Sequence, residues 1–332
     1  MPDTDYFLKI SAKTNKEKPF IPKGHIVAWE QFKLPLTINT ETVKVETITP
    51  EETKDYFIYT GDSFKITISK TTGRIISYIA NGNELFKSDL HPYFWRAATD
   101  NDLGNGMTKK CHVWKDAHKH QKLINIEKID NSICVKTKLT TANTLYNTLY
   151  TVFKNGEINI HNEFIPQTDK LPFIPRIGMQ VEIVPEFNSV SWYGRGPQEN
   201  YADRKDGAAI GLYASSINKE FHRYVRPQET GNKEDLKWMS LKNKDGNTLK
   251  IYADEYFSAS TLPFKYSQLY HGGKNKPNKH GGEIEIENII SLQINHKQIG
   301  VGGDDSWGAP VHSEYSIPVK TYKYDIKIKF EN

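Results

Sequence analysis

The sequence predicts an all-β protein of many antiparallel strands joined by long loops. Polar and apolar residues alternate along much of the chain, and Ile, Val, Thr, Tyr and Phe are frequent in the alternating segments. Turn signals separate these segments, as in NGN at 81–83 and NKDGN at 243–247. Segments with a helical period are few. These three observations favour a very large sandwich of two broad, curved sheets.

The individual elements follow from the same pattern. The segment KKCHVWKDAHKHQ at 109–121 is the most helix-like or irregular one, and we expect it to be an excursion from a loop. Strands are expected where the period is close to two, namely at 42–49, 64–69, 74–80, 132–140, 157–165, 179–184, 283–294 and 322–330.

Two polar seams suggest how the chain is divided. One is EKPFIPKGH at 17–25, and the other is TPEETKD at 49–55, which has the composition of a linker. We expect residues 1–48 to form part of a small β-domain and residues 49–332 to form the large sandwich. The chain starts without an apolar leader and soon enters a strand-like segment, which predicts no signal peptide and suggests a piece of a longer chain.

The composition argues against several classes of partner. The 44 basic and 40 acidic residues nearly balance at a net charge of +4, and no long basic run or nucleic-acid motif is present. No apolar run approaches the roughly 20 residues that cross a bilayer. Cys111 and Cys134 have no metal-type spacing, which argues against a disulfide framework. We therefore expect no nucleic-acid and no membrane partner.

Four segments concentrate Gly, Asp, Asn, Arg and aromatic residues without alternation. They are FWRAATDNDLGNGM at 94–107, WYGRGPQENYADRKDGAAIGLY at 192–213, HRYVRPQETGNKED at 222–235 and VGGDDSWGAP at 301–310. Loops on a rigid scaffold commonly carry function, so these segments hold the candidate site residues.

The acidic candidates have two interpretations. They are metal ligands or paired catalytic carboxylates, or they cap turns with their own backbone. The DND spacing does not match an EF-hand loop, and the two histidines at 118 and 120 lack further ligands at a fitting spacing, so the sequence predicts no metal site. The residues concerned are Asp100, Asn101, Asp102, Asp304 and Asp305.

Arginines accompany these acids, and the mixture favours bidentate pairs that hold loops rigid over direct contacts to sugar hydroxyls. The pairs would form among Arg96, Arg195, Arg204, Glu199, Asp203 and Asp206.

Trp307 is the other candidate, because a large indole is costly to leave on a polar turn. It either closes the core or forms an aromatic platform for the apolar face of a sugar ring. The residues alone leave both interpretations open.

Taken in order, FWRAATDNDLGNGM, WYGRGPQENYADR and VGGDDSWGAP resemble the C-terminal domain of the large bacterial β-galactosidases of glycoside hydrolase family two. The resemblance covers roughly residues 56–332. Residues 7–34, particularly GHIVAWEQF, resemble the end of the preceding immunoglobulin-like domain. The resemblance implies a galactose mutarotase-like supersandwich whose loops face a catalytic barrel in an earlier part of the chain.

The same resemblance implies which domain of the whole enzyme carries the catalytic residues and which carries the binding residues. The acid/base and nucleophile glutamates and the magnesium ligands belong to the barrel, so no catalytic residue and no cofactor is expected here. Trp307 would stack on the galactoside, while Asp304, Asp305, Arg96, Asp102 and Glu199 would brace loops or touch sugar. The expected partners are a galactoside or another carbohydrate, the missing domains of the same chain and a second subunit, in the bacterial cytoplasm or periplasm.

Two other functions stay open. The chain is alternatively a stand-alone carbohydrate-binding module, or a mutarotase-like enzyme with a general acid and a general base, commonly His and Glu. The sequence shows no His–Glu constellation that supports the second alternative. The basic, glycine-rich segment YHGGKNKPNKHGG at 270–282 departs from the family pattern and is expected to lengthen a loop.

Overall fold

The computed structural model describes residues 5–35, 45–270 and 279–332. The chain forms two compact units, Met1–Val45 and Glu46–Asn332, and each is described by itself. Residues 42–44 and most of the segment 270–282 lie outside the described residues. The strand expected at 42–49 is not formed in its described part, where residues 45–49 contribute only an isolated bridge between Thr47 and Phe153. In the described part of the chain, no helix is long and apolar enough to cross a membrane.

The described residues of the smaller unit form an antiparallel hairpin. Strand β1 (Phe7–Lys13) pairs with β2 (Ile26–Lys33), and Ile10 lies opposite Glu30. The seam at 17–25 belongs to the connection inside this hairpin, so it is not a boundary. The hairpin leaves Ile10, Val27 and Phe32 exposed, and an isolated two-stranded hairpin is only marginally stable in water.

The larger unit begins with a small antiparallel sheet in the order β3-β4-β5-β6-β7. The segment 49–55 is therefore not a free linker, because Glu51 and Glu52 pair with β4. The five strands are β3 (Glu51–Glu52), β4 (Tyr56–Thr60), β5 (Phe64–Ser69), β6 (Ile75–Ala80) and β7 (Asn83–Glu84).

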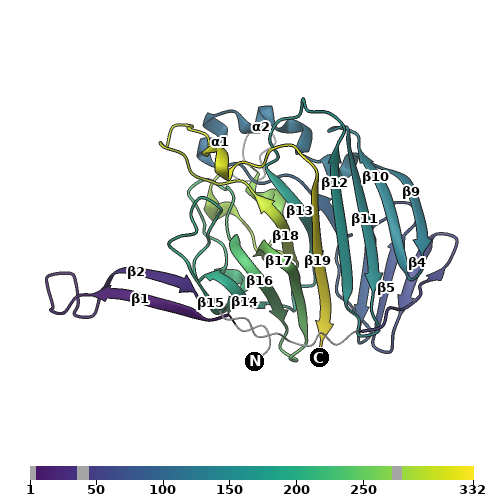
Figure 1. Ribbon diagram of the computed structural model, residues 1–332, viewed down its shortest axis with the longest axis horizontal. Coiled ribbons are helices and arrows are strands. Elements are labelled where there is room, and N and C mark those ends of the chain that lie inside the picture. Colours follow the sequence, from purple (N-terminus) through teal and green to yellow (C-terminus); the bar gives the residue numbers. More distant parts are fainter. Residues whose placement is uncertain (1–4, 36–44, 271–278) are drawn as a thin grey trace. The chain divides into compact units, whose positions relative to one another are not determined.

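The second sheet of this unit has 12 strands, all antiparallel to their neighbours (Figure 1). Its main path runs in the order β15-β14-β16-β17-β19-β12-β11-β10-β9, and β18, β13 and β8 form a branch. The strands are β8 (His91–Tyr93), β9 (Gln121–Ile129), β10 (Ser132–Leu139), β11 (Thr144–Val152), β12 (Ile158–Pro166), β13 (Arg176–Ile183), β14 (Ser189–Gly196), β15 (Ala209–Ser216), β16 (Lys233–Lys242), β17 (Thr248–Leu262), β18 (Ile290–Gln298) and β19 (Tyr322–Glu331).

The branch arises in β17, which is 15 residues long. Its first part, Thr248–Tyr252, pairs with β19, and its last part, Ser258–Leu262, pairs with β18. One strand thus changes partner along its length, and the sheet divides there. The all-β, antiparallel prediction is confirmed, and of the two broad sheets expected, one is a branched sheet of 12 strands and the other a small sheet of five.

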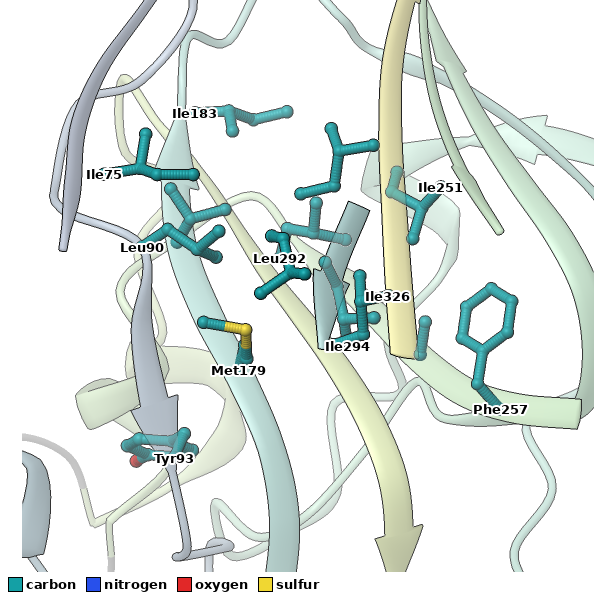
Figure 2. Close-up of a cluster of buried hydrophobic side chains, with 14 of the residues drawn as sticks. Ile75, Leu90, Tyr93, Met179, Ile183, Ile251, Phe257, Leu292, Ile294 and Ile326 are labelled. Carbon is teal, nitrogen blue, oxygen red and sulfur yellow. The ribbon is translucent and has the colours of Figure 1, made fainter. Parts of the chain in front are cut away.

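Apolar side chains from both sheets fill the space between the layers (Figure 2). Ile75 comes from β6, Met179 and Ile183 from β13, and Leu292 and Ile294 from β18, and all five are buried. Strands β11 and β12 bury every second residue, as the sequence period demands. Burying one such side chain contributes roughly 1.5–3 kcal/mol, so this core holds the strands in register.

Short helices cluster at one end of the sheets. They include α1 (Asp100–Gly104), α2 (Met107–Lys110) and the 3₁₀ turns η1 (His112–Trp114) and η2 (Ala117–His120), which confirms the irregular segment expected at 109–121. The remaining 3₁₀ turns are η3 (Ile217–Lys219), η4 (Tyr266–Leu269), η5 (Gly281–Glu283) and η6 (Ser313–Tyr315).

Two sequence predictions were wrong in their boundaries. The alternation from 283 does not form a strand before Ile290, because Glu283 accepts backbone hydrogen bonds from Lys279 and His280 and closes a turn. The segment 192–213 is not a loop throughout, since β14 continues to Gly196 and β15 begins at Ala209.

Acid should destabilise the larger unit partly through His118. Its ring stacks on His91 at 4.5 Å between centroids, and burial lowers the pKa of His118 to about 3. The unfolded chain takes up this proton near pH 6.5, so the contribution of neutral His118 is present above that pH and is lost as the pH falls towards 3. In urea unfolding, His118→Phe should weaken the pH dependence by at most about 1.4 kcal/mol per pH unit. His120→Asn, at an exposed position, should leave the pH dependence of the free energy of unfolding unchanged. If His118→Phe also leaves it unchanged, this account is contradicted.

Candidate functional site

All four non-alternating segments of the sequence meet at the end of the sheets that carries α1. Thr99 caps α1, and its backbone N–H donates to Asp102, whose own backbone N–H donates back to the Thr99 hydroxyl. The segment 301–310 lies against this helix, because Asn101 Nδ2 donates to the Asp305 carbonyl at 2.7 Å (Figure 1). At Gly104, a Cβ would lie 2.7 Å from the Trp307 carbonyl oxygen, so only glycine allows this approach.

The loops enclose a polar cavity of about 440 Å³. A second, more open hollow adjoins it and shares Asp100, Tyr224, Gln228 and Ser306 with it. Trp307 lines this second hollow. The lining of the first cavity comprises Thr99, Asp100, Asn101, Glu199, Tyr201, Arg204, Tyr224, Gln228, Glu229, Val301, Gly303, Asp304, Asp305 and Ser306.

Trp307 is 89% exposed and is not part of the sandwich core. The Asp305 carboxylate accepts hydrogen bonds from the backbone N–H groups of Trp307, at 2.8 Å, and Ala309, at 3.0 Å. These bonds hold the pKa of Asp305 below its ordinary value. The turn is thus fixed by a short acidic side chain, while its large aromatic side chain extends into water.

Asp304 lies at the rim of the polar cavity and is mostly exposed. Its carboxylate pairs with Nε2 of His312 at 2.8 Å, and this hydrogen bond raises the pKa of His312. The cavity wall also carries the exposed Arg204. An acceptor and a donor therefore face the same hollow and are able to bond hydroxyl groups.

Glu199 lines the cavity, but the protein already occupies both of its carboxylate oxygens. Tyr224 donates to one oxygen, and the hydroxyl of Thr230 (2.8 Å) and the N–H of Gly231 (2.6 Å) donate to the other. Nearby, Asp203 accepts from the N–H of Gly302 at 2.6 Å. Both acids tie neighbouring loops together.

Arg96 and Asp102 lie beneath the cavity and do not line it. Their ion pair is buried, with 2.6 Å between Nη2 of Arg96 and Oδ2 of Asp102. Asp102 also accepts the N–H of Thr99 at the start of α1. The structure therefore places this pair where it fixes the entry to the helix.

A buried network that the sequence did not reveal lies further inside. Nη2 of Arg176 donates to Glu229 at 3.0 Å, to Tyr266 at 3.1 Å and to Gln298 at 2.6 Å. Tyr266 donates to Glu229 and accepts the N–H of Ala97 at 2.9 Å. Both members of the ion pair have fully buried side chains. No local pattern marks Arg176, since it begins an ordinary buried strand.

Metal binding has little support at these loops. Among the described residues, no three His, Cys, Asp or Glu side chains are arranged as a metal ion requires. His118 stacks on His91, and His120 is exposed.

The fold and the loop cavity define an all-β sandwich domain that presents a polar ligand-sized hollow at one end. The chain belongs to the beta galactosidase small chain family, whose model matches residues 60–328. A second model, for domain 4 of beta-galactosidase, matches residues 1–35.

Curated relatives are named beta-galactosidase. One from Priestia megaterium is 34% identical over 322 residues, covering 95% of this chain and 30% of the relative. One from Lactobacillus delbrueckii subsp. bulgaricus is 33% identical, and the match covers 77% of this chain and 25% of the relative. One from Pseudoalteromonas haloplanktis is 28% identical, and the match covers 97% of this chain and 32% of the relative. The chain thus spans about a third or less of the relatives it matches, and it corresponds to their C-terminal part.

Solved structures show a weaker similarity. A putative aldose 1-epimerase from Escherichia coli K12 matches with a TM-score of 0.48 and 8% identity, covering 83% of this chain and 98% of that one. A galactose 1-epimerase from Lactobacillus acidophilus NCFM matches with a TM-score of 0.43 and 10% identity, covering 87% of this chain and 99% of that one. Nothing about the chemistry of this chain follows from values this low.

Removing one member of the buried network should be costly. Arg176→Met leaves the Glu229 carboxylate buried without its cation, and we expect a loss of about 3–5 kcal/mol in the free energy of unfolding. Arg226→Met removes the exposed pair with Asp100 and should cost no more than about 1 kcal/mol. Urea unfolding of both variants measures the two losses. Equal losses in the free energy of unfolding would show that the buried network contributes no more than an exposed ion pair.

Proposed function

We propose that this chain is the C-terminal, non-catalytic part of a β-galactosidase that hydrolyses terminal β-D-galactosides with retention. Membership of the family and the chain's share of its relatives support this proposal. The two carboxyl groups that such hydrolysis needs would lie outside this chain. Any magnesium would be bound there too, since the described acids near the cavity hold loops and do not gather around a common centre.

The contribution of the chain would be the wall of the active-site mouth. The observation that carries this proposal is the 89% exposure of Trp307, an indole held on a braced turn beside a polar hollow. An indole face packs against the C–H groups of a pyranose, while Asp304 and Arg204 bond its hydroxyls. Glu199, Asp305, Arg96 and Asp102 would act on the sugar only indirectly, by fixing these loops.

A stand-alone carbohydrate-binding role is the second candidate, and the cavity of about 440 Å³ favours it. A single exposed ring beside an open hollow buries little of a sugar, so the isolated chain should bind galactose only weakly. Within the whole enzyme, this surface would face the missing domains of the same chain, and an additional subunit would extend the interface.

The role of Trp307 is tested in a whole β-galactosidase that contains this chain. Trp307→Ala should lower kcat/KM for an aryl β-galactoside about two- to tenfold, mainly through KM, because a stacked ring contributes about 0.5–1.5 kcal/mol. Trp307→Phe should retain most of the activity. Leu212→Ala, which shortens another exposed side chain outside both hollows, is the control.

Two results would contradict the proposal. An unchanged kcat/KM in Trp307→Ala would remove the stacking role. Clear turnover of the aryl galactoside by the 332-residue chain alone would show that the catalytic groups lie within it. Calorimetry of the chain with galactose decides the second candidate: strong binding that Trp307→Ala abolishes would favour a self-sufficient binding module.

A further inference from the structure

The floor of the loop cavity carries two side chains that are buried and yet incompletely bonded. Tyr201 is 4% exposed and Glu229 is 2% exposed, and both line this cavity of about 440 Å³. The hydroxyl group of Tyr201 and Oε1 of Glu229 are almost withdrawn from solvent, and no described residue bonds either atom. Buried polar atoms are bonded in the great majority of cases, so each exception needs a physical reason.

Glu229 is held in place through its other carboxylate oxygen. Oε2 accepts hydrogen bonds from Nη2 of Arg176, at 3.0 Å, and from the hydroxyl group of Tyr266. Arg176 also donates to the hydroxyl oxygen of Tyr266 at 3.1 Å. The carboxylate is thus fixed in position, while its Oε1 atom stays available as a hydrogen-bond acceptor.

Tyr201 belongs to a segment that is tied to the segment of Glu229. The backbone N–H of Asn200 donates to the carbonyl oxygen of Asn232 at 2.9 Å. Burial raises the pKa of Tyr201 well above its ordinary value, and the carboxylates of Glu199 and Glu229 raise it further. The charge of Glu229 therefore acts on the Tyr201 hydroxyl at close range, and this hydroxyl keeps its proton and serves as a donor.

The two unbonded atoms are complementary to one kind of chemical group. The Tyr201 hydroxyl donates a hydrogen bond, and Oε1 of Glu229 accepts one. A ligand hydroxyl accepts and donates at the same time, so a single hydroxyl between them satisfies both atoms. Neither atom has an existing bond to lose when such a group binds. An anionic ligand would instead bring its charge against Glu229, and an apolar ligand would leave both atoms unsatisfied.

A sugar hydroxyl and a water molecule both have this property, and the position of the cavity favours a sugar. The cavity adjoins the hollow that Trp307 lines, so a carbohydrate on the indole extends into it. The catalytic groups of the proposed enzyme act on the galactosyl ring and would lie outside this chain. The cavity is therefore placed for the other sugar of a disaccharide substrate, which is the leaving group.

We propose that Tyr201 and Glu229 bind one hydroxyl group of the leaving sugar and thereby favour disaccharides over galactosides whose leaving group carries no hydroxyl. The Tyr201 hydroxyl donates to the oxygen of this group, and the group donates to Oε1 of Glu229. Both side chains bind the substrate and take no part in the chemical step. This inference rests on the proposed function and adds a preferred class of substrate to it.

The test is Tyr201→Phe in a whole β-galactosidase that contains this chain, assayed with lactose and with a nitrophenyl β-galactoside. The ratio of kcat/KM for lactose to kcat/KM for the nitrophenyl galactoside should fall about two- to tenfold, mainly through the KM for lactose, because one neutral hydrogen bond is lost. Tyr56→Phe, the same change on an exposed residue outside both hollows, should leave the ratio unchanged. Glu229 is not substituted, because it also neutralises Arg176.

Urea unfolding of the same variant distinguishes a sugar hydroxyl from a structural water. The Tyr201 hydroxyl bonds no described residue, so Tyr201→Phe should not lower the urea midpoint in the absence of sugar. A lowered midpoint with an unchanged ratio would show that a water satisfies these atoms and would overturn the proposal. An unchanged ratio with an unchanged midpoint overturns it as well. The Trp307→Ala assay with an aryl galactoside tests the proposed function separately, so the failure of one is distinguishable from the failure of the other.

Discussion

The guanidinium group of Arg176, fully buried at the start of β13, is the contact on which the loop end of the larger unit depends. It bonds Glu229 from the 222–235 segment, Tyr266 from η4 and Gln298 from β18, and Tyr266 in turn accepts a backbone N–H from the 94–107 segment. Removing either member of this buried ion pair would leave the other charge uncompensated, and Nε and Nη1 of Arg176 and Oε1 of Glu229 already lack a described partner. Segments far apart in sequence are therefore held in one arrangement around a single cation.

Above this buried network, most acidic side chains near the cavity accept hydrogen bonds or ion pairs that hold the loops in place. Glu199 accepts three hydrogen bonds, Asp102 pairs with Arg96, and Asp305 accepts the backbone of the Trp307 turn. Carboxylates that are already satisfied by the protein are poor ligands for another group. The exposed indole of Trp307 and the few less occupied polar groups are what this surface would offer to a sugar in the role proposed above.

The sequence predicts a strand or a site residue well when the contacts of that residue are close in the sequence, and poorly when they are distant. Period-two alternation located β5, β10, β12 and β19 closely, because their burial follows directly from strand geometry. The strand predicted from residue 283 does not begin until Ile290, because local hydrogen bonds to Glu283 close a turn. The sequence singled out all four loop segments and Trp307 as candidates, but Arg176 carries no local signal, since its role comes from a contact with Glu229, 53 residues further along the chain.

The sequence by itself therefore determined the all-β class, the polar loops and, through the resemblance, the family. The tertiary structure alone decided that the large sheet branches at β17, which acids brace loops, and which lie open to a cavity. The physical reason is that periodicity and composition act between neighbours in the chain, whereas desolvation and hydrogen bonding depend on residues that only folding brings together.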